Sequence, residues 1–106
     1  GIVIGTLKEG ESGLDTLNVT STASLTSNGY TKVSVTPSKG SNNSYKYKVA
    51  DDCKLPQYLG NVKTYPTWDG TSEIEAETGK EIMIIECDSN YRAVKAGIAT
   101  VQSKDE

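Results

Sequence analysis

Five glutamates gather in the last third of the chain and could supply a carboxylate pair for glycoside or proton chemistry: Glu73, Glu75, Glu77, Glu81 and Glu86. Such a pair needs a cleft that raises the pKa of one member, so that one carboxyl stays protonated beside an ionised partner. Glu73, Glu75 and Glu77 instead alternate with Ile74 and Ala76, which is the pattern of a strand with one face in solvent. We therefore expect a protein that is not an enzyme.

The chain offers few residues for other catalytic or metal-binding chemistry. The chain has no histidine, which removes the usual general base near neutral pH, the standard serine and cysteine triads and the commonest metal ligand. Asp51, Asp52 and Asp69 could contribute oxygen ligands for calcium, but their spacing fits no EF-hand loop. Aspartates that form turns are the alternative. We expect neither a bound metal nor a cofactor.

Aromatic residues are the better candidates for a binding site. Tyr58, Tyr65 and Trp68 lie in or beside the longest irregular segment, where exposed rings could stack on a sugar or a peptide. The alternative for Trp68 is burial as the main core residue. This alternative is favoured because the chain has one Trp and no Phe.

Covalent cross-links are a further question. Cys53 and Cys87 could form a disulfide, or they could be two reduced and buried small hydrophobes. A lysine–asparagine isopeptide cross-link would need a buried acid beside the pair, and the sequence alone does not place such an acid.

Charge and hydropathy exclude two classes of partner. The formal net charge is −3 with a pI near 4.9, so the surface has no sustained attraction for nucleic-acid phosphates. No 18-residue apolar run is present, which argues against membrane insertion.

The pattern of strands predicts an all-β, antiparallel β-sandwich of six or seven strands. Alternation is clean over residues 30–36 and 45–49, with Lys46 and Lys48 on the solvent side. Residues 82–85 are apolar on both faces and therefore central in their sheet, and further strands are expected around residues 74–76 and 92–101. We expect a Gly/Ser/Thr-rich arm or linker over residues 1–27, the sandwich over 28–103 and a frayed tail over 104–106.

Five short segments carry a resemblance to a known class of protein: residues 45–50 (YKYKVA), 68–74 (WDGTSEI), 77–80 (ETGK), 86–88 (ECD) and 93–97 (AVKAG). Together they resemble Ig-like (fibronectin-III-like) accessory or repeat modules of virion proteins, capsid or tail, of phages of Gram-positive bacteria, and of related bacterial surface proteins.

The resemblance implies a non-catalytic structural or adhesive module on a virion or on the extracellular surface of a Gram-positive bacterium. Its partners would be proteins of a larger assembly, and a glycan is a second candidate. The alternative is a carbohydrate-binding module that uses the loop aromatics Tyr58, Tyr65 and Trp68.

Overall fold

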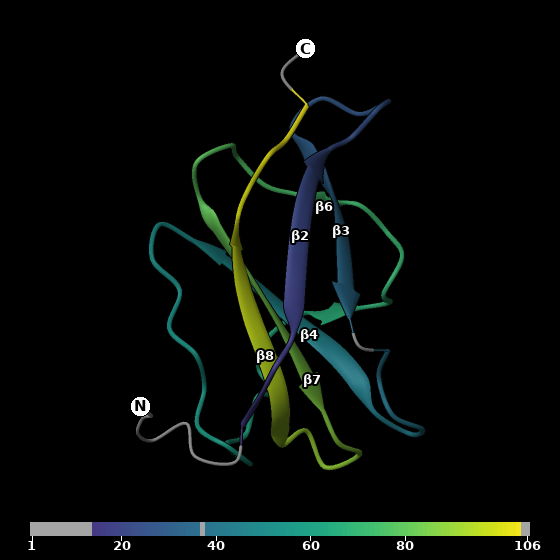
Figure 1. Cartoon of the computed structure of the whole chain (residues 1–106), viewed down its shortest axis with the longest axis vertical. Coiled ribbons are helices and arrows are strands. Elements are labelled where there is room, and N and C mark those ends of the chain that lie inside the picture. Colours follow the sequence, from purple (N-terminus) through teal and green to yellow (C-terminus); the bar gives the residue numbers. More distant parts are fainter. Residues whose placement is uncertain (1–13, 37, 105–106) are drawn as a thin grey trace.

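The computed structural model describes residues 14–36 and 38–104, which form a β-sandwich without helices (Figure 1). The strands are β1 (Asp15–Thr16), β2 (Asn18–Ala23), β3 (Tyr30–Thr36), β4 (Ser44–Ala50), β5 (Thr67–Trp68), β6 (Ile74–Glu75), β7 (Glu81–Cys87) and β8 (Ala93–Thr100). One sheet has the order β1-β8-β7-β4-β5 and the other the order β2-β3-β6. All pairings are antiparallel except β1 with β8. The predicted all-β, Ig-like sandwich is confirmed; β1, β5 and β6, of two residues each, bring the number of strands to eight.

The two period-two segments form strands of seven residues each, as expected. β3 covers the predicted residues 30–36, and β4 extends the predicted 45–49 by one residue at each end. β7 lies between β8 and β4 at the centre of the larger sheet, because its side chains are buried on both faces. The strand expected around residues 92–101 is β8, which covers residues 93–100.

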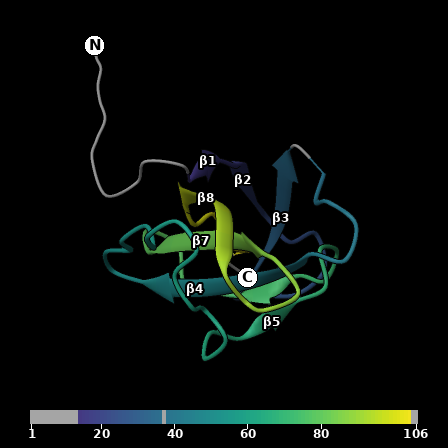
Figure 2. The same ribbon diagram turned by 90° about the horizontal axis from the view of Figure 1, so that it is seen from below.

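Each face of β7 contributes to a separate hydrophobic cluster. Ile82 and Ile84 face the inter-sheet core, which also holds Leu17, Val33, Tyr45, Trp68, Ile74, Ala76 and Val101. Figure 2 shows β2 and β3 as one layer above β7, β4 and β5. Met83 and Ile85 belong to the second cluster, together with Cys53, Val62, Cys87, Ala93 and Ala96.

The second cluster explains one wrong expectation. Lys46 was predicted to lie on a solvent face, but it is buried, with 5% of its surface exposed. It lies opposite Ile85 in the ladder, and its Nζ donates a hydrogen bond to Thr67 Oγ1 at 2.6 Å. Val62, from the long irregular segment between β4 and β5, belongs to the same cluster, so residues of this segment cover the face that alternation alone assigns to water.

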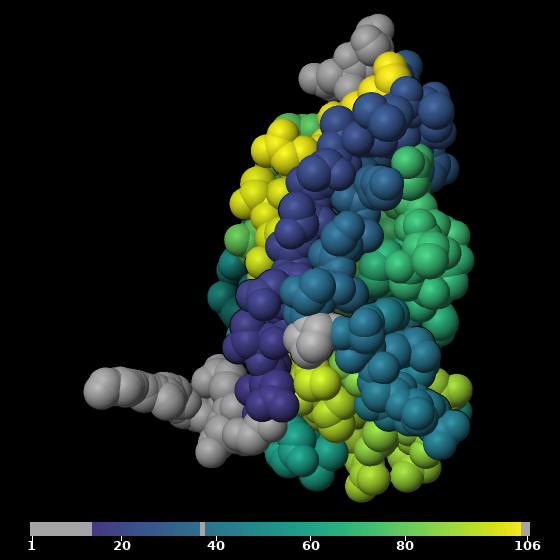
Figure 3. All heavy atoms as spheres, turned by 45° about the vertical axis from the view of Figure 1, so that its right-hand side comes forward, coloured from purple at the N-terminus to yellow at the C-terminus, as the bar shows by residue number. Residues whose placement is uncertain are grey.

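Part of the predicted arm, residues 1–27, contains two strands of the sandwich. β2 pairs with β3 over six residue pairs, from Asn18 with Thr36 to Ala23 with Thr31, and β1 pairs with β8. Figure 3 shows this segment, in purple, packed along the surface between β8 and β3. The rest of the predicted arm, residues 1–13, lies outside the described residues.

The start of the predicted frayed tail is held by backbone hydrogen bonds. Lys104 N donates to Tyr30 O at 3.0 Å, and Gly29 N donates to Lys104 O at 2.9 Å. The Lys104 ammonium also donates to Asn28 Oδ1 at 2.9 Å. Lys104 therefore belongs to the sandwich, and residues 105–106 lie outside the described residues.

Candidate functional site

Trp68 is a core residue of the sandwich. Only 4% of its surface is exposed, and its ring packs against Tyr45 with 5.3 Å between the ring centroids. The indole Nε1 donates a hydrogen bond to Ser72 O at 2.8 Å, so its polar atom is satisfied inside the fold. The ring has no free face on which a sugar could stack, which leaves the core alternative for this residue.

Tyr58 and Tyr65 differ from Trp68 in their burial and in their contacts. Tyr65 packs against the second cluster, and the Lys48 ammonium lies 6.0 Å from its ring centroid. Tyr58 is exposed, with 44% of its surface accessible. The structure therefore does not bring the three predicted aromatic residues together as one stacking platform.

Tyr91 is an exposed aromatic residue that was not among the predicted site residues. The ammonium groups of Lys46 and Lys63 lie 5.0 and 5.9 Å from its ring centroid. Tyr91 has a positive φ of 61°, as does Leu59 with 63°, an uncommon conformation for bulky side chains. Leu59 N and Val62 N donate to Ala93 O and Tyr91 O, so these two turns hold each other in place.

Cys53 and Cys87 are both buried, and both are free thiols in the structure. Cys53 lies at one end of β7, where its N–H donates to Glu81 Oε1 at 2.8 Å. Cys87 lies at the other end, six residues along the strand, or roughly 20 Å away at the usual rise. Burial, and then the charge of Glu81, raise the pKa of the Cys53 thiol.

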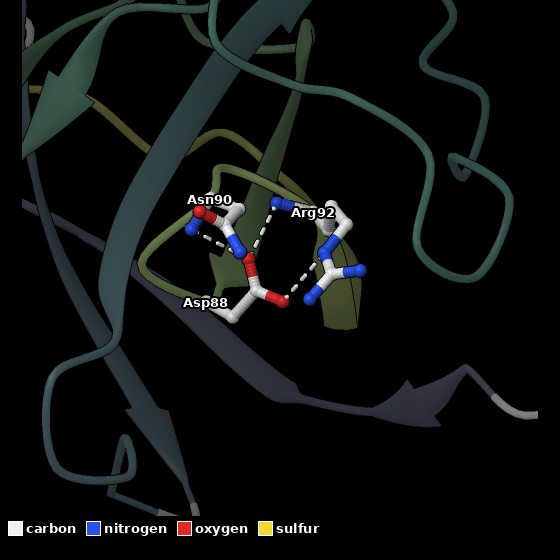
Figure 4. Close-up of polar contacts among 3 residues, drawn as sticks. All are labelled: Asp88, Asn90 and Arg92. Atoms are coloured by element: carbon white, nitrogen blue, oxygen red, sulfur yellow. Dashed lines mark hydrogen bonds and ion pairs between the residues drawn. The ribbon is translucent and has the colours of Figure 1, made fainter.

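Aspartates in the loops form turns. Asp69 accepts hydrogen bonds from the backbone of Thr71 and Ser72, and these contacts, with the Ser72 hydroxyl foremost, hold the pKa of its carboxyl well below the usual range. Asp88 accepts from the N–H groups of Asn90 and Arg92 and pairs with the Arg92 side chain (Figure 4). Among the residues that the structure describes, no three acidic or cysteine side chains gather as a metal site.

Glu86 is the chemically unusual residue of the described chain. It is fully buried and continues the inward face of β7 that begins with Ile82 and Ile84. Its Oε2 accepts hydrogen bonds from Gly40 N at 2.8 Å and from Asn43 Nδ2 at 2.7 Å. Its Oε1 lies 3.5 Å from Lys95 Nζ. The burial of Glu86 was not predicted from the sequence, where its period-two spacing from Ile82 and Ile84 is the one signal for it.

Comparison with known proteins gives a family. Residues 26–104 match the family described as S-layer protein SbsC C-terminal domain. The chain belongs to this family. This assignment supports the surface-protein half of the resemblance found in the sequence, whereas the link to phage virions is not shown.

Solved structures of the S-layer protein SbsC have the same fold as this family member. The crystal structure of SbsC domains 7, 8 and 9 is 27% identical, with a TM-score of 0.66 over 87% of this chain and 28% of that chain. The structure of domains 4–9 is 26% identical, with a TM-score of 0.64 over 85% of this chain and 14% of that chain. The chain thus spans under a third of either solved protein, and no curated protein matches it.

The described part of this S-layer family member has no helix that is long and apolar enough to cross a bilayer.

Proposed function

We propose that this chain is a non-catalytic structural domain of a bacterial surface-layer protein, where it works as one unit in a row of domains. The family match over residues 26–104 carries this proposal. The shares of the solved chains support it further, because 28% of a three-domain structure and 14% of a six-domain structure are each close to one domain.

The shape of the domain fits such a row. Its dimensions are 41 × 31 × 22 Å, and the two ends of the described chain lie toward opposite ends of the long axis (Figure 1). A neighbour at the Lys104 end would meet Leu25, 88% of whose surface is exposed. It would also meet a shallow depression lined by residues that include Asn28, Gly29 and Ser103. We propose that contacts at these ends, and with other proteins of the layer, are the domain's mechanism.

Immunogold electron microscopy of intact cells tests the location. Antibodies raised against the purified chain should label a regular layer on the outside of a Gram-positive source cell, and brief protease treatment of intact cells should remove the label. Label confined to the cell interior would refute the proposal. Label on phage particles alone would favour the virion instead.

A glycan remains the second candidate partner, and the exposed ring of Tyr58 is the observation that favours it. Isothermal titration of the chain with cell-wall glycan fragments tests this role. Binding that is lost in Tyr58→Ala and Tyr65→Ala would support it, and the absence of heat at millimolar glycan would exclude it.

A further inference from the structure

Glu86 carries a negative charge into the protein interior without a full set of partners. It is 0% exposed, and although Oε2 accepts two hydrogen bonds, Oε1 has no hydrogen-bond donor among the described residues. A buried carboxylate oxygen left without a donor destabilises a fold, because the hydrogen bonds to water that it loses on burial are not replaced. The contact that compensates in part is the ammonium of Lys95, at 3.5 Å.

Two reactive side chains therefore meet the two oxygens of one buried carboxyl group. Lys95 reaches Oε1 from β8, where it pairs with Glu86 in the ladder. The Asn43 side chain reaches Oε2 from the turn before β4, with its amide nitrogen 2.7 Å away. Residues paired directly across an antiparallel ladder point to the same face, so Lys95 and Glu86 lie on one side of the sheet.

The turn before β4 holds Asn43 in this position. Asn43 N donates to Gly40 O at 3.1 Å, and Asn42 adopts the left-handed conformation with φ 68°. Gly40 packs so closely that a Cβ there would lie 3.3 Å from Asn43 Nδ2 and 3.8 Å from Glu86 Oε2. The amide is thus pre-positioned, and such positioning is what makes an intramolecular reaction between side chains fast.

We propose that Lys95 and Asn43 form an intramolecular isopeptide bond, with Glu86 as the proton-transfer group. Glu86 Oε1 accepts a proton from the Lys95 ammonium, and the lone pair of the freed amine attacks Asn43 Cγ to form the Nζ–Cγ bond. Glu86 passes protons from Nζ to Nδ2, and the Cγ–Nδ2 bond breaks. Ammonia leaves with the bonding pair and takes up the remaining proton as ammonium.

The atoms and charges of this reaction balance without any other reactant. A lysine ammonium and an asparagine amide become one secondary amide and one ammonium ion, Glu86 returns to its starting state, and nothing is oxidised or reduced. The Lys95 side chain is 25% exposed, and its ammonium lies against a carboxylate that is 1% exposed and can take its proton. A lysine amine becomes nucleophilic once a neighbouring base has removed its proton. The product replaces an ion pair whose carboxylate is buried by a neutral amide. The inference stands on side-chain geometry and does not depend on the proposed function.

Intact-mass spectrometry of the denatured chain tests the proposal. The wild-type protein should be lighter than its encoded mass by one ammonia, and Lys95→Arg, Asn43→Ser and Glu86→Gln should each have the encoded mass. Lys95→Arg keeps the charge beside Glu86, so it remains informative if Glu86→Gln does not fold. Lys48→Arg, on the neighbouring strand β4, is the matched control and should still show the loss.

Tryptic peptides locate the bond. Trypsin should release a branched peptide that joins residues 40–46 to residues 93–104, because a cross-linked Lys95 is not cleaved. The Asn28-Gly29 pair could lose ammonia as a succinimide, but that loss would persist in Lys95→Arg. A wild-type protein with its encoded mass, or an ammonia loss that is as large in Lys95→Arg as in the wild type, would overturn the proposal.

Discussion

Gly97→Ala should destabilise the domain strongly, because the chain between β1 and β2 crosses β8 at this glycine. A Cβ at position 97 would lie 2.0 Å from Leu17 O and 2.9 Å from Val19 Cγ2. Position 97 lies inside β8 and has no positive φ, so the penalty comes from this steric overlap and not from backbone strain.

The size of the effect follows from what must move. Relieving the overlap takes a shift of more than about 1 Å between two backbones, and overpacking of this kind costs about 1–3 kcal/mol. The shift would also break the 2.9 Å hydrogen bond from Leu17 N to Ala96 O and loosen Leu17, which is 2% exposed. Alanine also lowers the conformational entropy of the unfolded chain, which offsets up to about 1 kcal/mol of the lost stability. We expect a net loss of about 2–3 kcal/mol, or a fall of about 1–2 M in the urea midpoint.

Urea unfolding followed by tryptophan fluorescence measures this loss. Gly79→Ala is the comparison variant, since a Cβ there meets nothing within 4 Å and only its left-handed backbone adds a cost, of about 1–2 kcal/mol. Hydrogen exchange should also show the Leu17 amide losing protection in Gly97→Ala. A midpoint equal to or above that of the wild type would mean that residues 15–19 do not pack on β8, which would refute the reasoning.

Three further results are expected. The two cysteines should react with a thiol reagent only after unfolding, without prior reduction, because both are buried and free; a protein whose thiols appear only after reduction would contradict the structure. Trp68 should emit in the blue in the folded state and should not respond to glycans, because it is 4% exposed; a red emission would contradict its burial. The pKa of Asp69 is lower in the folded than in the unfolded state. The ionised carboxylate therefore stabilises the fold above the unfolded pKa of about 4, and this stabilisation is lost as the pH falls from that value toward the folded pKa. Asp69→Asn should therefore lose less stability than the wild type between about pH 4 and pH 2, and equal losses would show that the turn does not act through its charge.

The strands that the sequence predicted well are those whose apolar side chains follow a simple period. Residues 30–36 form β3 as predicted, and the doubly apolar run of β7 lies at the centre of its sheet. Both could be found because apolar burial leaves a direct mark on the sequence.

β2 was missed because its inward positions are partly polar. Ser21 is 9% exposed and Thr31 is fully buried, and their hydroxyl groups lie 2.5 Å apart between β2 and β3. Ser21 Oγ also accepts a hydrogen bond from Gln102 N at 3.0 Å. A buried hydroxyl that finds its partner ten residues away looks in the sequence like part of a Ser/Thr-rich linker.

The buried acid was missed for a related reason. Glu86 lies among other glutamates in the sequence, several of which are exposed, and its partners Gly40 and Asn43 are more than forty residues away. Apart from its period-two spacing from Ile82 and Ile84, nothing local separates it from Glu75 or Glu77, which lie on the surface. Only the register that places Tyr45 opposite Glu86 brings the turn before β4 to this carboxylate.

In the proposed row of domains, the parallel pairing of β1 with β8 would bear tension that is applied along the row. β1 opens the described chain and β8 leads to Lys104, so tension along the long axis would slide these two strands past each other. In this shear geometry the hydrogen bonds between the strands are loaded together and not one after another. The proposed bond between Lys95 and Asn43 would add a covalent tie from β8, across β7, to the turn before β4. The covalent tie would then hold β8, the strand that leads to the C-terminal end of the domain, when tension is applied. If the bond forms, Lys95→Arg should lower the unfolding force in single-molecule pulling.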